Sequence, residues 1–276
     1  MKKIGLALGG GGAKGLAHIL MLEAFDELGL RPAAIAGTSI GAGIAALYAL
    51  GLTAHDIRHG IDSLAPPPLR GHITRRLFRK DVQDLAGQID PKLGRRGLLR
   101  GQKFLGFLYK ALRGATFEDL KIPLTVVAAD FWRREQVVFN SGELLTPLKA
   151  SMAMPWILAP VVYEGRVLID GGTVNPVPYD LLPADCDVTV AIDVLGTRAP
   201  RASGKPLFFD GIFNAFQIME KTIVEEKMKR KPCDIYIRPE IVDVRVLEFF
   251  RRDQIYRQAA PAKEELKRRL AEELTR

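Results

Sequence analysis

The sequence predicts an α/β fold built around a mainly parallel central sheet. Residues 3–50 read twice in succession as a short apolar run, a glycine-rich turn and a helical segment. Two later stretches, 122–129 and 188–194, are almost unbroken apolar runs, which are typical of strands covered on both faces. Successive strand–helix units containing such strands favour a parallel sheet with helices packed on its faces.

The first strand–helix unit places a strand at 3–8 and a helix at 13–28. Apolar residues recur every three or four positions through that helix, as one buried face requires: Ala17, Leu20, Met21, Ala24, Phe25 and Leu28. Gly29 ends the helix. The second unit has a strand at 33–36 and a helix at 40–50.

The second half of the chain predicts further strands and a terminal helix. We expect a hairpin at 161–169 and a final strand at 235–237. The C-terminal tail, from about residue 251 to residue 276, is helical from residue 254 onward. Two pairs of opposite charge lie four positions apart on it: Glu264 with Arg268 and Glu265 with Arg269. Its apolar line is narrow (Leu266, Leu270 and Leu274), so we expect an exposed helix packed by one edge.

Two stretches resemble targeting or membrane segments. Residues 1–13 begin with two lysines and continue as an apolar run, but four successive glycines would break the helix of a signal peptide. Residues 32–54 carry no charge and are long enough to span a bilayer. Because this stretch contains four glycines, a strand, a turn and a buried helix explain it better. We therefore expect neither a cleaved signal nor a membrane span.

The composition is that of a folded protein in a reducing compartment. The 276 residues carry a formal net charge of +8, and 47% of them are hydrophobic, which excludes a disordered chain. The only two cysteines, Cys186 and Cys233, exclude a disulfide-held scaffold and favour a cytoplasmic location. No internal repeat or linker divides the sequence, so we expect a single domain over residues 1–276.

The first glycine-rich turn, residues 9–15 (GGGGAKG), admits three interpretations. A nucleotide-binding P-loop needs Gly-Lys followed by Ser or Thr, but here Lys14 is followed by glycine. A dinucleotide site needs an acidic residue after the second strand, where Ala36 and Gly37 stand. The third interpretation is an oxyanion hole, in which backbone N–H groups at a helix N-terminus face developing negative charge.

The second turn, residues 37–41 (GTSIG), has the G-x-S-x-G pattern between a predicted strand and a predicted helix. In such a turn a strained backbone exposes the serine hydroxyl at the sheet edge, and the flanking glycines remove side chains that would clash. Ser39 is therefore the candidate nucleophile. The alternative is a glycine-rich turn in which Ser39 only caps the helix.

A serine nucleophile needs a base, and the histidines are poorly placed to provide one. None of the four lies in the last two hundred residues, so the serine–acid–histidine order of an α/β-hydrolase triad is impossible: His18, His55, His59 and His72. We expect His18 to face solvent or a neighbouring loop, and the other three to lie at the surface.

A carboxylate is the remaining candidate base. Asp130, Asp170 and Asp193 each stand at the end of a predicted strand. Asp170 is favoured because two glycines follow it and allow backbone to approach a site closely, although Asp-Gly is also a common tight-turn sequence. A lone carboxylate is a weak base toward a hydroxyl, so it should be desolvated and already hydrogen-bonded to the serine.

These motifs together resemble the signature blocks of the patatin-like phospholipases. The blocks are residues 10–15 (GGGAKG), 37–41 (GTSIG) and 170–172 (DGG), and the segments 150–155 (ASMAMP) and 175–178 (NPVP) also fit. The resemblance extends in order from about residue 2 to residue 194. It implies a three-layer α/β/α fold and a Ser-Asp dyad that works without histidine.

Carried over position by position, the resemblance implies that Ser39 is the nucleophile and Asp170 the general base. The implied oxyanion hole takes in Gly10, Gly11, Gly12 and Lys14, the last at a position where the family has Arg or Lys. Five more glycines would support the motifs: Gly15, Gly37, Gly41, Gly171 and Gly172. We expect no cofactor and no metal, since the sequence has no His/Cys cluster with metal-ligand spacing.

The activity that the resemblance implies is hydrolysis of phospholipids, lysophospholipids or other acyl esters through an acyl-serine. Two alternatives use the same fold: a thioesterase or acyltransferase on the same dyad, and a non-catalytic lipid-sensing protein. We expect no nucleic-acid partner, because few aromatic residues stand among the basic ones and no nucleic-acid-binding motif is visible.

Residues 65–114 form a basic segment in which twelve Lys or Arg residues stand against three Asp. Our hypothesis is a lid or a membrane-contact surface, because basic side chains are attracted to an anionic leaflet and the interleaved apolar residues could enter it. This would place the protein peripherally at the inner face of the membrane. The alternative is a helical subdomain whose charges are solvated.

Overall fold

The structure, a computed structural model, describes residues 2–63, 105–197 and 208–275. Its centre is an eight-stranded sheet in the order β5-β6-β3-β2-β1-β7-β8, with β4 paired to β3 outside this path. Five strands are parallel: β1 (Ile4–Leu8), β2 (Ala34–Thr38), β3 (Leu124–Asp130), β7 (Val188–Ile192) and β8 (Ile235–Ile237). Three are antiparallel: β4 (Glu135–Phe139), β5 (Val161–Tyr163) and β6 (Arg166–Asp170). The expected mainly parallel sheet is confirmed.

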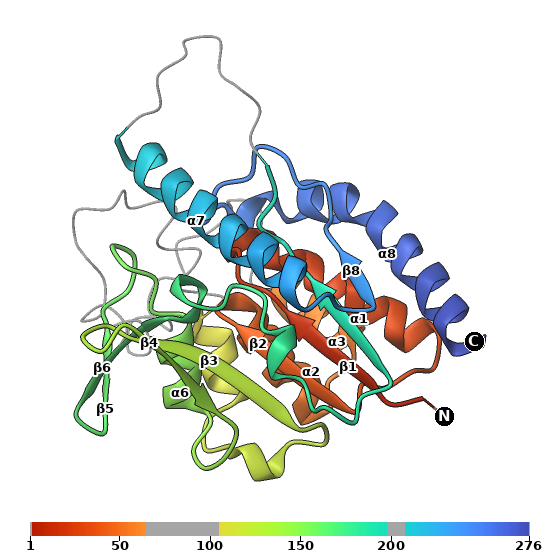
Figure 1. The fold of residues 1–276 in the computed structure, drawn as a ribbon, viewed down its shortest axis with the longest axis horizontal. Coiled ribbons are helices and arrows are strands. Elements are labelled where there is room, and N and C mark those ends of the chain that lie inside the picture. Colours follow the sequence, from red (N-terminus) through yellow and green to blue (C-terminus); the bar gives the residue numbers. More distant parts are fainter. Residues whose placement is uncertain (1, 64–104, 198–207, 276) are drawn as a thin grey trace, which may run out of the picture.

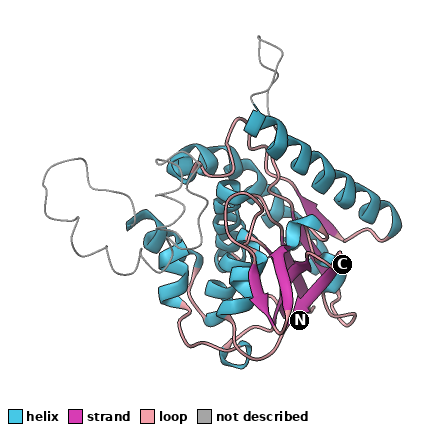
Figure 2. Ribbon diagram, turned by 90° about the vertical axis from the view of Figure 1, so that its left-hand side faces the viewer, coloured by secondary structure: helices cyan, strands magenta, loops and turns pink. Residues whose placement is uncertain are grey.

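Helices cover both faces of the sheet (Figure 1). Leu6 and Leu8 point from β1 into a large core shared with four helices: α1 (Ala17–Glu27), α2 (Ile40–Leu50), α3 (Ala54–Ser63) and α8 (Arg252–Thr275). On the opposite face, small side chains of the central strands pack in a cluster with Val224 of α7 (Phe208–Arg230). Figure 2 shows the sheet lying between α7 and the other helices. This is the three-layer arrangement that the resemblance implies.

Short 3-10 helices mark several turns around the sheet. They are η1 (Gly12–Leu16), η2 (Phe117–Asp119), η3 (Gly171–Thr173), η4 (Tyr179–Leu181) and η5 (Phe249–Arg251). The helix predicted at 13–28 is thus divided, because the chain forms η1 first and continues as α1 only from Ala17. The second helix begins and ends at the predicted residues, 40 and 50.

His18 contradicts the expectation that it faces solvent, because its side chain is fully buried. Helix α1 packs against the sheet, α3 and α8, so the face of α1 outside its apolar stripe is covered as well. The imidazole Nε2 lies 2.8 Å from Gly9 O. Burial lowers the pKa of His18 to about 4, so the ring is neutral near pH 7. His55 and His59 are exposed, as expected, and His72 lies outside the described residues.

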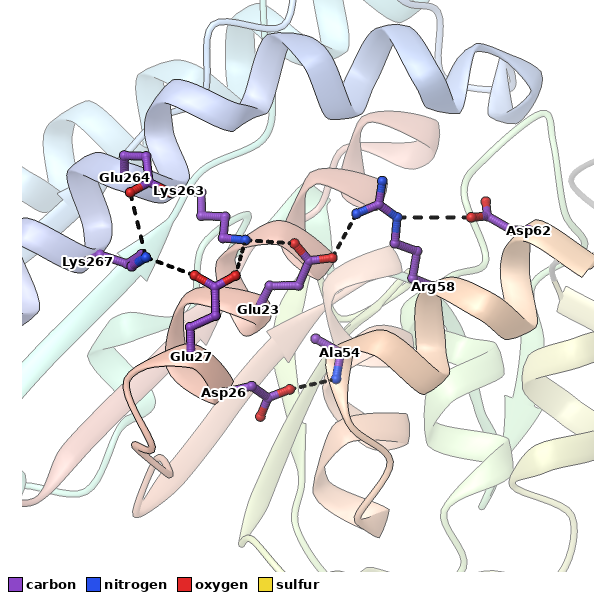
Figure 3. Close-up of polar contacts among 9 residues, drawn as sticks. All are labelled: Glu23, Asp26, Glu27, Ala54, Arg58, Asp62, Lys263, Glu264 and Lys267. Atoms are coloured by element: carbon purple, nitrogen blue, oxygen red, sulfur yellow. Dashed lines mark hydrogen bonds and ion pairs between the residues drawn. The ribbon is translucent and has the colours of Figure 1, made fainter.

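Helix α8, near the C-terminal end of the chain, packs against α1, near the N-terminal end. Leu266 and Leu270 are fully buried in the main core. At the rim of this contact, Lys263 bridges Glu23 and Glu27 of α1 at 2.9 and 2.5 Å (Figure 3). The same network continues through Arg58 of α3 and Lys267 of α8, which pair with Glu23 and Glu27, respectively.

The two ion pairs predicted within α8 are wrong. Glu264 pairs with Lys267 instead, and Arg268 pairs with Glu272. Arg269 donates hydrogen bonds to the backbone oxygens of Asp234 and Tyr236 beside β8, so its guanidinium is directed to the sheet rather than along the helix.

Four helices and strands were not expected from the sequence: α3, β4, α6 (Leu145–Ser151) and the long helix α7. Most of the basic segment, residues 65–104, lies outside the described residues. Its last part, 105–114, begins with a helix at 105–111 and enters the core, where Leu108 and Leu112 are fully buried. The lid and membrane-contact hypotheses for this segment therefore remain predictions.

Within the described part of the chain, no single helix is long and apolar enough to cross a membrane. Helices α2 and α3 satisfy the length and composition criteria only when taken together, and they meet at a bend of 120°.

Candidate active site

Ser39 stands on a sharp turn between β2 and α2. Its backbone has φ 54° and ψ −127°, a left-handed conformation that a residue with a side chain rarely adopts. The Ser39 N–H donates to Ser151 Oγ at 2.8 Å, which holds the turn in place. Its own side chain makes no capping bond to α2, so the interpretation of Ser39 as a helix cap does not fit the geometry.

The turn needs glycines for steric reasons. A Cβ on Gly41 would collide with the backbone oxygen of Leu8, and a Cβ on Gly37 would collide with the backbone of Ala42. Gly15, in the first turn, lies against the side chain of Ile40 in the same way. These contacts bring the first two strand–helix units together around Ser39.

The structure brings Ser39 and Asp170 together. Ser39 Oγ donates a hydrogen bond of 2.6 Å to Asp170 Oδ2. Asp170 is only 4% exposed. Its Oδ1 accepts a second hydrogen bond, of 2.8 Å, from Gly172 N–H. Burial raises the pKa of Asp170 to about 6, although the hydrogen bonds from Ser39 and Gly172 oppose this rise. The carboxylate therefore has the desolvation and the contact that a base acting on a hydroxyl needs.

The segment 150–155 (ASMAMP) positions both members of this pair. Ser151 is fully buried and accepts from the Ser39 N–H, while Ala153 O accepts from Asp170 N–H at 3.0 Å. The sequence placed this segment within the family pattern but gave Ser151 no role. The sequence offers one sign of such a role for Ser151: the short motif 150–155 contains a serine and ends in a proline, which is typical of a tight turn.

The first glycine-rich turn lies beside Ser39, and the structure corrects one of its expected donors. Gly10 N–H donates to Pro176 O at 2.9 Å, so it is not available to a ligand. Gly11 and Gly12 lie at the start of η1 and line the same pocket as Ser39. The first N–H groups of a helix have no carbonyl partner within that helix. Lys14 is buried, and its aliphatic chain lies against Gly196.

The other two candidate carboxylates serve their own turns. Asp130 Oδ1 accepts from the backbone N–H groups of Trp132 and Arg133 in the β3–β4 turn. Asp193 accepts from the Leu195 N–H and from the hydroxyl of Tyr236.

A largely apolar pocket opens next to Ser39 and Asp170. Its apolar lining residues are Ile40, Leu105, Met152, Met154, Ile157, Leu158, Phe216, Val246, Leu247 and Phe249. Two polar side chains of α7, Gln217 and Glu220, complete its wall. Such a lining suits a long hydrocarbon chain better than a polar ligand. Sequence reasoning missed this wall because it missed α7.

No group of three or more His, Cys, Asp or Glu side chains is placed to hold a metal ion in the regions 2–63, 105–197 and 208–275.

A serine on a strand–helix turn, hydrogen-bonded to a buried carboxylate beside an apolar pocket, is the arrangement of a serine acyl hydrolase. Residues 6–183 match the family model of the patatin-like phospholipases. The chain belongs to this family.

Comparisons with individual proteins agree with this assignment. An uncharacterised NTE family protein of Mycobacterium tuberculosis is 32% identical over 206 residues, which cover 74% of this chain and 52% of that protein. Lysophospholipase NTE1 of Kluyveromyces lactis is 28% identical over 276 residues, covering 92% of this chain and 18% of that protein. The chain thus spans about half the length of the mycobacterial relative and a smaller share of the yeast one.

Among solved structures, VipD from Legionella pneumophila has a similar fold. The TM-score is 0.51 at 14% sequence identity, and the match covers 97% of this chain and 66% of VipD. At this level of identity the similarity concerns the fold alone.

Proposed function

We propose that this protein is a serine acyl-ester hydrolase that acts on lysophospholipids or phospholipids. The observation that carries the proposal is the 2.6 Å hydrogen bond between Ser39 Oγ and a buried Asp170, at the wall of an apolar pocket. Membership of the patatin-like phospholipase family and the lysophospholipase name of the yeast relative support the lipid substrate class.

In the first half of the proposed reaction, Ser39 Oγ attacks the carbonyl carbon of the ester. Its proton passes to Asp170 Oδ2, and the carbonyl oxygen becomes an oxyanion. Gly11 and Gly12 offer N–H groups to this oxyanion, and each such donor is typically worth about 10²- to 10³-fold in rate. Collapse of the intermediate breaks the ester C–O bond. The alcohol leaves with the proton from Asp170, and the acyl group remains on Ser39.

In the second half, Asp170 takes a proton from a water molecule that attacks the acyl-serine. Collapse of the second intermediate releases the fatty acid and returns the proton to Ser39 Oγ. The raised pKa of Asp170 suits both halves, because a base with a pKa near the working pH accepts and returns a proton readily.

Fluorophosphonate labelling combined with product analysis tests the proposal. The parent protein should be labelled and should release fatty acid from lysophospholipid, while Ser39→Ala should do neither. Mass spectrometry of the products with and without an added alcohol or thiol acceptor separates hydrolysis from acyl transfer. A Ser39→Ala variant that hydrolyses the lipid as fast as the parent would contradict the assignment. An unlabelled parent would favour the non-catalytic alternative.

We further propose that the protein acts peripherally at a lipid surface in the cytoplasm. Trp156 and Phe250 are about half exposed and directly neighbour Ile157 and Phe249, which line the pocket. Exposed aromatic residues next in sequence to the lining of an apolar pocket are candidates to enter a membrane interface. Co-sedimentation with anionic vesicles across a salt series tests this, with zwitterionic vesicles as the control. Absence of binding to anionic vesicles at low salt would contradict it.

A further inference from the structure

Glu220 is a buried carboxyl group in the wall of the active-site pocket. It lies on α7, is only 6% exposed, and lines the same pocket as Ser39 and Asp170. Charged side chains are rarely buried unless they are paired. The mechanism described above gives Glu220 no task, so its position calls for an explanation.

Glu220 faces the Asp170 turn directly. Gly172 lies between the carboxyl groups of Glu220 and Asp170. A Cβ added to Gly172 would collide with Glu220 Oε1 and would lie 3.1 Å from Asp170 Oδ1. The two carboxyl groups therefore border the same small space above η3. Helix α7 is held there at its far end, where Lys227 donates to Val177 O at 2.6 Å and to Asp180 Oδ1 at 2.5 Å.

The hydrogen bonds indicate which of the two groups is ionised. Asp170 receives one bond from Ser39 Oγ–H and one from Gly172 N–H, both of which favour the carboxylate. Glu220 receives no hydrogen bond from the residues that the structure describes. Two like charges in one buried site oppose each other, so a single negative charge should lie on Asp170 and the proton on Glu220.

The charged groups around Glu220 support this distribution. Asp170 at the end of β6 and Asp193 after β7 both raise the pKa of Glu220, while Lys14 of η1 lowers it. Burial is the largest cause, and together these causes hold the pKa of Glu220 well above its ordinary value.

We propose that Glu220 is a positioning residue that must keep its proton for the reaction at Ser39, and that its ionisation sets the alkaline limit of activity. The inference rests on the proposed function of the Ser39–Asp170 pair. An ionised Glu220 would oppose the oxyanion that forms beside Gly11 and Gly12 in the same pocket.

The test compares pH profiles of the parent with those of Glu220→Gln and Glu220→Met, in which position 220 has no ionisable group. Glu225→Gln is the matched control, because Glu225 lies on the same helix with an exposed side chain that pairs with Lys221. Two rates are followed from about pH 5 to about pH 10: hydrolysis of a soluble acyl ester, corrected with Ser39→Ala, and covalent labelling by a fluorophosphonate. Thermal melting confirms that each variant is folded.

We expect the parent and Glu225→Gln to lose activity on the alkaline side by up to about tenfold per pH unit. On the alkaline side, the activities of Glu220→Gln and Glu220→Met should stay within about twofold of their maximum values. If one of these two variants does not fold, the other gives the result. Folded variants that keep the alkaline decline, or that are inactive at every pH, would overturn the inference, and so would a parent without an alkaline decline.

Labelling separates the two levels of the proposal. A parent that is labelled with the expected profile but hydrolyses no acyl ester supports the role of Glu220 and contradicts the proposed hydrolase function. A parent that hydrolyses esters while the position 220 variants keep its profile contradicts only the inference about Glu220. A parent that reacts with neither probe overturns both.

Discussion

At the scale of single residues, Ser39 combines a reactive hydroxyl with a strained backbone. Ser39 has a left-handed φ of 54°. For a residue with a side chain, such a backbone conformation costs about 1–3 kcal/mol of conformational free energy. The strain is held by the hydrogen bond from Ser39 N–H to Ser151 and by the packing of β2 against α2. It orients Oγ toward Asp170 instead of toward the end of α2.

Two variants without the hydroxyl should reveal this strain. We expect Ser39→Gly to be more stable than Ser39→Ala by about 1 kcal/mol, because glycine adopts a positive φ without steric cost. Urea unfolding of the two inactive proteins measures the difference. Equal free energies of unfolding would mean that the backbone at residue 39 relaxes when the serine is removed.

Asp170 should give the activity an acidic limit. Its pKa of about 6 means that this proposed general base is protonated below that pH. We expect kcat/KM for a soluble ester to fall about tenfold per pH unit below pH 6 and to level off above pH 6, until the alkaline decline attributed to Glu220 begins. A profile with its inflection near pH 4 would indicate an ordinary, solvated carboxylate, and would contradict the burial seen at this site.

The same shift predicts a cost in stability. The pKa of Asp170 is higher in the folded protein, about 6, than the ordinary value of 3.8, so the folded state loses stability as pH rises between these values. Asp170→Asn removes that titration. At pH 8 we expect this variant to be inactive but more stable than the parent by about 2 kcal/mol. Urea unfolding at pH 8 and pH 4 measures this, and an advantage that persists at pH 4 would contradict the explanation.

At the residue scale, the sequence predicts which side chains lie together where a motif imposes the geometry. Excluding the histidines leaves three strand-end carboxylates, the two glycines after Asp170 favour it, and the resemblance to the patatin-like phospholipases implies its pairing with Ser39. The structure joins the two side chains at 2.6 Å. Gly10 was grouped with its neighbours because a run of glycines does not reveal which N–H group is already bonded to Pro176. The burial of His18 depends on tertiary packing of α1, one of whose partners, α8, lies more than two hundred residues away in the sequence, and no local pattern near residue 18 reports it.

At the scale of elements, close approach of β1 and α2 builds the site. The two units meet where Gly41 of α2 touches the backbone of Leu8 and Gly9. Any side chain at residue 41 would push α2, and with it the Ser39 turn, away from the first glycine-rich turn. The tight contact thus keeps Ser39 within reach of Gly11 and Gly12.

Adding one methyl group should test this contact. We expect Gly41→Ala to lower the free energy of unfolding by about 2–3 kcal/mol, because backbone atoms of Leu8 and Gly9 occupy the space. Gly106→Ala is the matched control: Gly106 lies in the helix at 105–111 with nothing near its Cβ position, so alanine should raise stability by up to about 1 kcal/mol. Chemical denaturation compares both with the parent. A Gly41→Ala protein as stable as the parent would show that α2 shifts freely.

Element prediction failed most clearly at α7. Its buried face includes Phe216, Glu220 and Val224, spaced four residues apart, so the central position of an otherwise apolar line is an acid. A carboxylate at such a position is typical of a solvated face, so the pattern does not predict a buried helix. Glu220, the acidic residue that interrupts the apolar pattern of α7, is also the residue that faces Asp170. The mismatch between the local sequence and the buried helix therefore lies at the candidate site.

At the scale of the whole molecule, the site extends beyond the segment that carries the family motifs. The family match ends at residue 183, yet Phe216, Glu220, Val246 and Phe249 line the pocket. The later residues also supply β7 and β8, which extend the sheet beyond β1. The motifs contain the proposed reacting groups, while the last third of the chain closes the pocket around them. We therefore expect acyl-chain preference to depend on this last third.

The C-terminal helix should then be essential to the stability of the whole fold. Leu270 of α8 is fully buried in the core it shares with α1 and β1, while Leu274, one turn later, is only partly buried. We expect Leu270→Ala to lower the free energy of unfolding by about 2–5 kcal/mol and Leu274→Ala by less than about 1 kcal/mol. Denaturant unfolding followed by tryptophan fluorescence reports on Trp132 and Trp156, both outside α8. If α8 were an independent tail, Leu270→Ala would leave that transition unchanged. A single shifted transition would show that the end of the chain folds together with the site.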